Sequence, residues 1–176
     1  FVPYERDPEK LTRRWAIPGT RGLEHRIGGL EKTVNGTVSY IPENHEKMVK
    51  IREQKVRNVQ KEISPLEVYG EQEGDLLIVG WGGTYGHLYT ATKALLSEGK
   101  KVGLAHFTFI NPMPANVTEV FSKFKKIVVC ELNMGQFASL LRINFQQFQY
   151  QQINKVQGLP FTTLEIKEKC LKLLEE

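Results

Sequence analysis

The sequence predicts an α/β fold with three layers, in which helices cover both faces of a mostly parallel sheet. An extended arm, a β-hairpin and a charged helix precede this domain. Continuous apolar runs at 75–81, 101–110 and 126–132 alternate with amphipathic segments, as in parallel sheets that are buried on both faces. Prolines and glycines interrupt the first 43 residues, whereas residues 43–63 contain neither. These observations separate an irregular beginning from a regular α/β remainder.

Residues 1–43 are predicted to form an extended arm that ends in a hairpin. Prolines and glycines recur along the segment and break any helical or strand periodicity. Asn35-Gly36 stands between two β-prone runs, and this dipeptide accepts the positive φ angles of a type I′ turn. Pro42 should end the hairpin. Because the arm is too polar and too interrupted to fold alone, we expect it to lie on the surface of a partner.

Residues 43–63 are predicted to form a charged helix that begins at Asn44 as its N-cap. Ser64 should end it, because the residue before Pro65 avoids the helical region. Lysine, arginine and glutamate mix on most faces and no aromatic residue lies among them, which is typical of a solvated surface rather than of a nucleic-acid interface. One narrow apolar stripe is expected, formed by Val49, Val56, Val59 and Ile63.

Residues 64–176 are predicted to form the α/β domain, so the expected boundary separates 1–63 from 64–176. Gly99 should cap the first helix of this domain at its C-terminus. That helix is expected to bury Leu88, Ala91, Thr92 and Leu95, and the last one Ile166, Cys170, Leu173 and Leu174. The expected helices cover about 84–98, 115–124, 135–148 and 162–176, and a shorter strand is expected near 153–157.

The glycine-rich turn at 80–86 is the first candidate for a ligand site. In the dinucleotide fingerprint, three glycines bring a helix N-terminus against a pyrophosphate, and an acidic residue ends the next strand. Here Tyr85 occupies the third glycine position, and the next strand offers His106 and Thr108 but no acid. No Gly-Lys-Ser/Thr follows the turn either. Two interpretations stay open: a tight structural turn, or a turn from Gly80 to Gly86 whose amides hold an anion.

The sequence lacks the short motifs of metal-dependent and nucleophilic catalysis, so no metal site and no catalytic residue is predicted. The four histidines are scattered, without a His-Glu-x-x-His or a Gly-x-Ser-x-Gly pattern. Cys130 and Cys170 stand alone, which fits neither a disulfide framework nor cluster ligation. We expect both thiols to be free and buried, in a reducing, cytoplasmic compartment. No apolar run approaches the ~20 residues of a membrane span.

Glu131 ends the third expected strand, directly before Leu-Asn-Met-Gly-Gln. In open α/β sheets, functional groups collect at the carboxyl ends of the strands. A carboxylate there serves either chemistry or the backbone amides of the neighbouring turn, and both interpretations stay open. Asn133 and Gln136 likewise contact either a partner or only their own turn.

Four segments, taken together and in order, resemble the alpha subunit of 2-oxoacid:ferredoxin oxidoreductases, especially the 2-oxoglutarate type. They are PGTRGLEHRIGGLEKTVNGTVSYIPENHEKMVKIREQKV (18–56), IVGWGGTYG (78–86), NPMP (111–114) and VVCELNMGQFASLLR (128–142). The first is similar to that family's Gly-Leu-Glu-His element, hairpin and Pro-Glu-Asn-His helix. The last is similar to its Val-Val-Glu-x-Asn-x-Gly-Gln signature. The resemblance covers nearly the whole chain.

The resemblance implies a C-terminal piece of that subunit, similar to the transketolase C-terminal domain; a start at Phe1 rather than Met fits such a piece. The complete enzyme would oxidatively decarboxylate a 2-oxoacid to its acyl-CoA, using thiamine diphosphate, magnesium, an iron–sulfur cluster and coenzyme A. Its partners would be the thiamine-pyrimidine domain, a beta subunit and ferredoxin, in a dimeric assembly of alpha–beta units. We expect this piece to hold no cofactor, to be inactive alone and to act as a scaffold.

The arm arginines are the remaining candidates for ligand contact. Arg13, Arg14, Arg21 and Arg26 lie on the arm, and guanidinium groups suit carboxylates and phosphates. In the complete enzyme they would face the oxoacid or coenzyme A, or else form interface salt bridges. With Glu131, Asn133 and Gln136, three of them, Arg14, Arg21 and Arg26, make up the candidate cofactor-binding set. The alternative function is a free-standing nucleotide- or anion-binding module that uses the Gly80–Gly86 turn.

Overall fold

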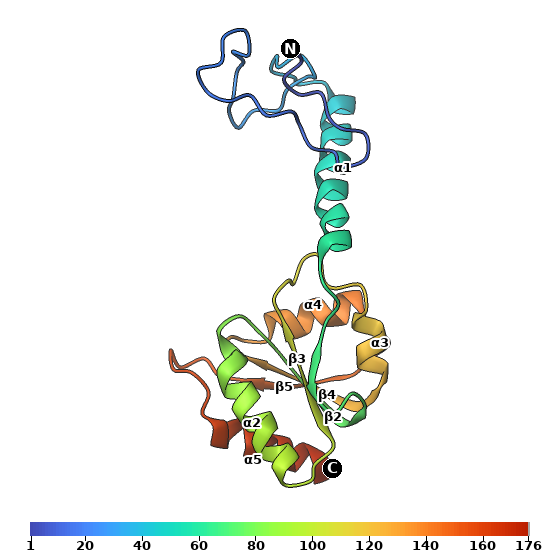
Figure 1. Cartoon of the computed structure of the whole chain (residues 1–176), viewed down its shortest axis with the longest axis vertical. Helices are drawn as coiled ribbons and strands as arrows, with labels where there is room; N and C mark the ends of the chain where they lie inside the picture. Colours follow the sequence, from blue (N-terminus) through green and yellow to red (C-terminus); the bar gives the residue numbers. More distant parts are fainter. Residues whose placement is uncertain (176) are drawn as a thin grey trace. The chain divides into compact units, whose positions relative to one another are not determined.

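The chain divides into two compact units in a computed structural model that describes residues 1–175 (Figure 1). The first unit covers Phe1–Glu62, and the second begins at Ile63. Each has its own internal hydrogen bonds and is described separately below.

The arm of the first unit is irregular, as the sequence predicts. Isolated antiparallel bridges join Arg6 to Arg13 and Lys32 to Val38. The amide of Asp7 donates to the Thr12 carbonyl at 2.9 Å, which closes the first of these two loops. Hydrogen bonds of turns and short loops therefore take the place of regular secondary structure in residues 1–41.

The expected type I′ turn is wrong in detail. Gly36 has a φ of 87°, but Leu11 is the one non-glycine residue with a positive φ within the described part of the chain. The amide of Gly36 donates to the Thr33 carbonyl at 3.0 Å, and the amide of Thr33 donates to the Thr37 carbonyl at 2.8 Å. The loop therefore holds three residues instead of two, so Gly36 alone supplies the left-handed conformation and Asn35 need not.

Helix α1 runs over Pro42–Asn58, and a 3₁₀ turn continues it over Val59–Glu62. Pro42 begins the helix instead of only ending the hairpin, since its fixed φ and missing amide hydrogen suit a first helical position. Asn44 is therefore not the N-cap: that position is Ile41, and the Asn44 side-chain amide donates to the Lys32 carbonyl at 3.2 Å. Asn44 thus fastens the helix to the hairpin.

The charged faces of α1 match the expectation of a solvated surface. Lys50 pairs with Glu46, and Arg57 pairs with Glu53, each one helical turn apart. The helix has no buried residue, and Val49 and Val56 of the expected stripe are each 45% exposed. The stripe therefore leaves apolar surface uncovered in the first unit.

The second unit is built on a five-stranded sheet with the order β1-β3-β2-β4-β5. Strand β1 is antiparallel to β3, and the other neighbours are parallel. Ile78 in the central strand aligns with Leu104 on one side and Val128 on the other. The strands are β1 Val68–Gly70, β2 Gly74–Trp81, β3 Val102–Phe107, β4 Phe124–Glu131 and β5 Tyr150–Asn154.

Helices cover both faces of this sheet, which confirms the three-layer prediction (Figure 1). On one face, Leu88 and Ile166 pack with Ile78 in a buried cluster. On the other, Phe121 and Phe137 pack with Val79 in a second cluster. The first face carries α2 Tyr85–Ser97 and α5 Thr163–Glu175, and the second carries α3 Val117–Ser122 and α4 Gln136–Asn144. Side chains of β2 therefore alternate between two cores.

Several element ends differ from expectation because local patterns do not show where packing stops. Strand β3 ends at Phe107, ahead of the cis Asn111–Pro112 bond. The fourth helix stops at Asn144, and the last strand lies at 150–154 rather than 153–157. Strand β1 was not expected from the sequence, because three residues on a sheet edge are too short to show a period. Gly99 follows α2 with a φ of 75°, as expected of a C-terminal cap.

Candidate functional site

The turn after β2 allows close packing because residue 80 is a glycine. A side chain there would place its Cβ 2.2 Å from Leu88 Cδ1 and 2.8 Å from Thr84 Oγ1. The Thr84 hydroxyl donates to the Trp81 carbonyl at 2.9 Å, which holds the 3₁₀ turn Gly82–Thr84 against the strand end. The absence of a side chain at Gly80 thus brings α2 directly onto the sheet. This supports the structural interpretation at Gly80, whereas a Cβ at Gly82, Gly83 or Gly86 would meet no atom within 4 Å.

Glu131 is fully buried at the carboxyl end of β4, and both of its carboxylate oxygens accept hydrogen bonds. Its Oε1 accepts hydrogen bonds from the Phe137 amide at 2.7 Å and from Trp81 Nε1 at 3.1 Å. Its Oε2 accepts from the Ala138 amide at 3.2 Å. A carboxylate at the start of α4 also interacts favourably with the helix dipole. These contacts with the amides at the start of α4 favour the structural interpretation of Glu131.

Asn133 and Gln136 belong to the same turn. The Asn133 side-chain carbonyl accepts from the Gly135 amide at 2.7 Å and from the Gln136 amide at 3.2 Å. Its amide group donates to Glu131 Oε1 at 3.4 Å. Gly135 has a φ of 96°, a conformation that suits glycine. The Glu-x-Asn-x-Gly-Gln signature is therefore a self-contained turn, in which Gln136 contributes its backbone amide.

The arm arginines do not gather as one set. Arg14 is exposed and lies 3.8 Å from Glu5, and Arg21 and Arg26 are exposed too. Of the four arginines considered as candidates, Arg13 alone lines a large cavity of the first unit. The structure thus does not bring the candidate residues Arg14, Arg21 and Arg26 together.

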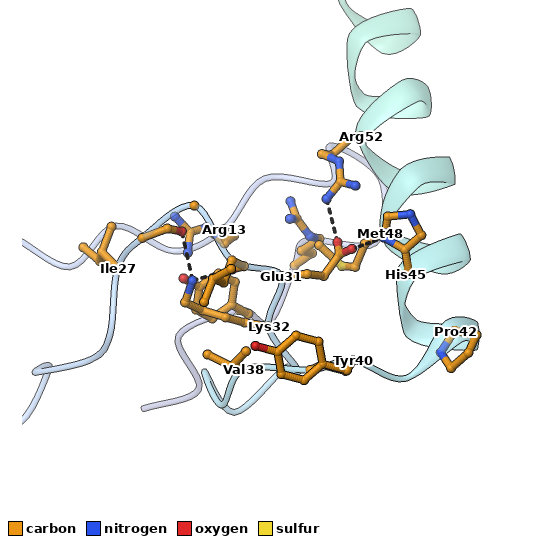
Figure 2. Close-up of a pocket in the computed structure, with 16 residues that line it drawn as sticks. Arg13, Ile27, Glu31, Lys32, Val38, Tyr40, Pro42, His45, Met48 and Arg52 are labelled. Atoms are coloured by element: carbon orange, nitrogen blue, oxygen red, sulfur yellow. Dashed lines mark hydrogen bonds and ion pairs between the residues drawn. The ribbon is translucent and has the colours of Figure 1, made fainter.

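That cavity, which we call the arm pocket, has a volume of about 940 Å³ and lies wholly within the first unit (Figure 2). Its one carboxylate is Glu31. Arg52 Nη1 donates to Glu31 Oε1 at 2.7 Å, and His45 binds the other carboxylate oxygen. Four cationic side chains line the arm pocket: Arg6, Arg13, Lys32 and Arg52.

The cationic side chains of the arm pocket differ in the groups that they contact. Lys32 is only 3% exposed, and its ammonium donates to the carbonyls of Gly28 at 2.9 Å and Leu30 at 2.6 Å. The Arg13 guanidinium lies 4.4 Å from the centre of the Tyr4 ring, as in a cation–π contact, and its buried Nη1 has no hydrogen-bond partner. Burial lowers the pKa of Arg6, and so do the nearby charges of Arg13 and Arg52.

Sequence reasoning missed Arg6, Lys32 and Arg52 as pocket residues. Their numbers show no common spacing, since they are brought together by loop bridges and by the Asn44 contact. The sequence indicated only an overall excess of positive charge in this region: residues 1–63 hold 13 basic and 9 acidic residues, whereas 64–176 hold 11 of each.

Cys130 and Cys170 are free and buried, as expected. Burial raises the pKa of Cys130, and it raises the pKa of Cys170 to about 12. Cluster ligands are thiolates, so these two side chains do not fit an iron–sulfur site. Within residues 1–175, no group of three His, Cys, Asp or Glu side chains is arranged to hold a metal ion. In the same residues, no helix is long and apolar enough to cross a membrane.

Comparison with known proteins places this chain in a family. Residues 74–168 match the pyruvate:ferredoxin oxidoreductase core domain II family. The 2-oxoglutarate oxidoreductase subunit KorA of Mycobacterium tuberculosis is 44% identical over 94% of this chain and 25% of its own length. The 2-oxoacid:ferredoxin oxidoreductase subunit alpha of Saccharolobus solfataricus is 30% identical over 80% of this chain and 23% of its own length.

Comparison with solved structures supports the same type of protein. The 2-oxoglutarate:ferredoxin oxidoreductase of Magnetococcus marinus, solved with 2-oxoglutarate, coenzyme A and succinyl-CoA bound, superposes with a TM-score of 0.88 and 32% identity. That match covers 97% of this chain and 30% of the other. A split-gene transketolase with 16% identity and a TM-score of 0.50, matched over 64% of this chain and 43% of its own, shows a likeness of fold alone.

The chain belongs to the pyruvate:ferredoxin oxidoreductase core domain II family. It is a part of an alpha subunit of the 2-oxoacid:ferredoxin oxidoreductase type. The chain spans about a quarter of the length of the curated relatives named above.

Proposed function

We propose that the chain is a scaffold of a thiamine-diphosphate-dependent 2-oxoacid:ferredoxin oxidoreductase, with 2-oxoglutarate as the substrate. The complete enzyme would convert the 2-oxoacid to its acyl-CoA and pass electrons to ferredoxin. The observation that carries this proposal is the match to the 2-oxoglutarate enzyme of Magnetococcus marinus over 97% of this chain. The 44% identity to a KorA subunit supports the same substrate class.

A scaffolding role, rather than catalysis, agrees with how the polar groups are used. Glu131, the last residue of β4, and Asn133, two positions further on, form hydrogen bonds within the turn before α4. His106 is half-buried, and burial lowers its pKa, which favours the neutral imidazole. We therefore propose that the segment is inactive alone. Thiamine diphosphate, magnesium, coenzyme A and the iron–sulfur cluster would bind elsewhere in the enzyme.

The apolar surface of the arm supports a role in assembly. Trp15 is 93% exposed and Tyr40 is 85% exposed, and Ile17 and Ile27 expose 70% and 75%. Large apolar side chains exposed together are typical of surfaces that bind another protein surface. We propose that the arm packs on the thiamine-pyrimidine domain or on the beta subunit, in a cytoplasmic dimer of alpha–beta units.

The test is assembly of the complete alpha subunit with its beta subunit. In the double variant Trp15→Ser, Ile17→Ser, we expect the two subunits to separate in analytical ultracentrifugation and 2-oxoglutarate-dependent reduction of ferredoxin to fall in parallel. The control is Leu164→Ser, which changes a 62%-exposed apolar residue of the second unit and should leave both readouts unchanged. Normal assembly and activity of the double variant would contradict the proposed role of the arm.

A further inference from the structure

We propose that the arm pocket is a binding site for an organic phosphate, a role that goes beyond the scaffold function. The site is built by the arm, the hairpin and α1, all of which belong to the first unit (Figure 2). The inference rests on three independent features: an uncompensated positive charge, a buried donor without a partner, and an apolar wall of suitable size.

Positive charge exceeds negative charge inside the arm pocket. Arg6, Arg13, Lys32 and Arg52 line it, against a single carboxylate. Both oxygens of Glu31 are already occupied by Arg52 and His45. The other cations have no carboxylate partner in the arm pocket: Lys32 donates to two backbone carbonyls, and Arg6 Nη1 donates to the Leu11 carbonyl at 2.9 Å. Burial, together with the charges of Arg13 and Arg52, lowers the pKa of Arg6. A bound dianion would offset the repulsion between these like charges, which is stronger in a partly buried space than in water.

Arg13 supplies a donor that no group within residues 1–175 satisfies. Its Nη1 is buried and makes no hydrogen bond, which is unusual, because most buried polar groups are paired. The Tyr4 ring fixes the plane of the guanidinium from a distance of 4.4 Å. A planar, pre-oriented guanidinium is suited to paired hydrogen bonds with phosphate oxygens. The unpaired Nη1 therefore marks the place of the anion.

The rest of the arm pocket suits an organic body attached to that anion. Ile27, Val38, Tyr40 and Met48 line it beside the cations. The volume of about 940 Å³ lies within the range of ~300–1,000 Å³ that is typical of small-molecule sites, and it far exceeds the space that one inorganic phosphate fills. A phosphate ester with a ring or an acyl chain fits both parts of this lining, with the phosphate against the cationic side chains and the ring or chain against the apolar ones. A monocarboxylate would leave most of the positive charge unbalanced.

The experiment is isothermal titration of the intact natural polypeptide that carries this chain, in its native assembly. The probes are ADP, pyrophosphate and, as a dicarboxylate, succinate. We expect ADP to bind more tightly than succinate, and its affinity to fall as salt is raised. Arg13→Gln should weaken ADP binding at least tenfold, and Arg6→Gln should also weaken it. Arg14→Gln, which changes the exposed neighbour outside the arm pocket, should leave the affinity unchanged.

Three results would overturn the proposal. The first is ADP and pyrophosphate both failing to bind. The second is ADP binding that Arg13→Gln and Arg14→Gln affect equally, because the phosphate would then be held elsewhere. The third is tighter binding of succinate than of ADP, which would mean that the arm pocket takes carboxylates, for example the acidic side chains of another segment. Circular dichroism of Arg13→Gln checks that the variant is folded, and Arg6→Gln gives an independent result if it is not.

Discussion

The indole nitrogen of Trp81 donates a hydrogen bond to the Glu131 carboxylate at 3.1 Å. The two residues lie fifty positions apart, at the carboxyl ends of the parallel strands β2 and β4. The same carboxylate accepts the amides of Phe137 and Ala138, which begin α4. One buried side chain thus joins two strand ends and one helix start, at the edge where α/β enzymes usually place their chemistry.

Replacing Glu131 should destabilise the second unit without affecting any chemistry. Glu131→Ala removes the acceptor of four donors, of which the amides of Phe137 and Ala138 are buried, so we expect the free energy of unfolding to fall by about 3 kcal/mol. Glu131→Gln keeps one accepting oxygen and should cost about half as much. Urea unfolding followed by circular dichroism measures both values. The control, Glu168→Gln, changes an exposed glutamate of α5 and should stay within about 0.5 kcal/mol of the unmodified chain.

Gly80 and Gly83 should respond in opposite ways to alanine. Gly80→Ala forces a methyl group against Leu88 and Thr84, so we expect a loss of about 1–3 kcal/mol in unfolding free energy. Gly83→Ala meets no atom within 4 Å and should be neutral or slightly stabilising. Thermal unfolding of the two variants side by side gives the comparison. Equal effects would show that close packing is not the reason for glycine at position 80.

The two thiols should be unreactive until the second unit unfolds. Cys130 and Cys170 are buried, and burial raises the pKa of each thiol, so little thiolate is available at neutral pH. We expect the folded chain to release almost no thionitrobenzoate from Ellman's reagent at pH 8. In urea, two equivalents should react. Rapid reaction of one thiol in the folded chain would contradict the burial described here.

Glu165 should make stability depend on pH in the acid range. The Lys155 ammonium lies 2.8 Å from its carboxylate, and this contact, together with the Thr162 amide, lowers the pKa of Glu165 from 4.5 to about 2. The folded state therefore binds fewer protons than the unfolded state between these values, and stability falls as pH drops from about 5 towards 2. The contribution is fully present above pH 5.

Glu165→Gln isolates this effect, because glutamine can keep the reciprocal capping contacts with Thr162 while losing the ion pair. We expect the variant to melt below the unmodified chain at pH 6, and the two melting temperatures to converge near pH 2. A constant difference across that range would assign the effect to the cap instead of the ion pair. Glu168→Gln again serves as the exposed control.

Most of the α/β part was predictable, because its longer elements have a local signal. Strand β2 is one apolar run, and Leu88, Ala91 and Leu95 show the helical period of α2 directly. The strand β1 was not predictable, because its three residues obtain their structure from pairing with β3. Resemblance to a family added the type of enzyme, which periodicity alone does not contain.

The candidate site was less predictable for a related reason. Arg6, Lys32 and Arg52 meet through loop bridges and a helix start, and no short-range pattern encodes such meetings. Glu131 was recognised as a notable position from its place at a strand end. Its role depended on the amides of Phe137 and Ala138, whose direction follows from the turn at Gly135. The pattern of side chains along the sequence does not show which backbone amides will bind a given side chain.

The chain has two tryptophans, and each of the two units contains one of them. Trp15 is 93% exposed, whereas Trp81 is partly buried and hydrogen-bonded to Glu131. Intrinsic fluorescence therefore separates the two units without any added label. In Trp15→Phe the emission reports on the sheet of the second unit, and in Trp81→Phe it reports on the arm. The docking of the arm and the melting of the sheet can thus be recorded as two independent optical signals.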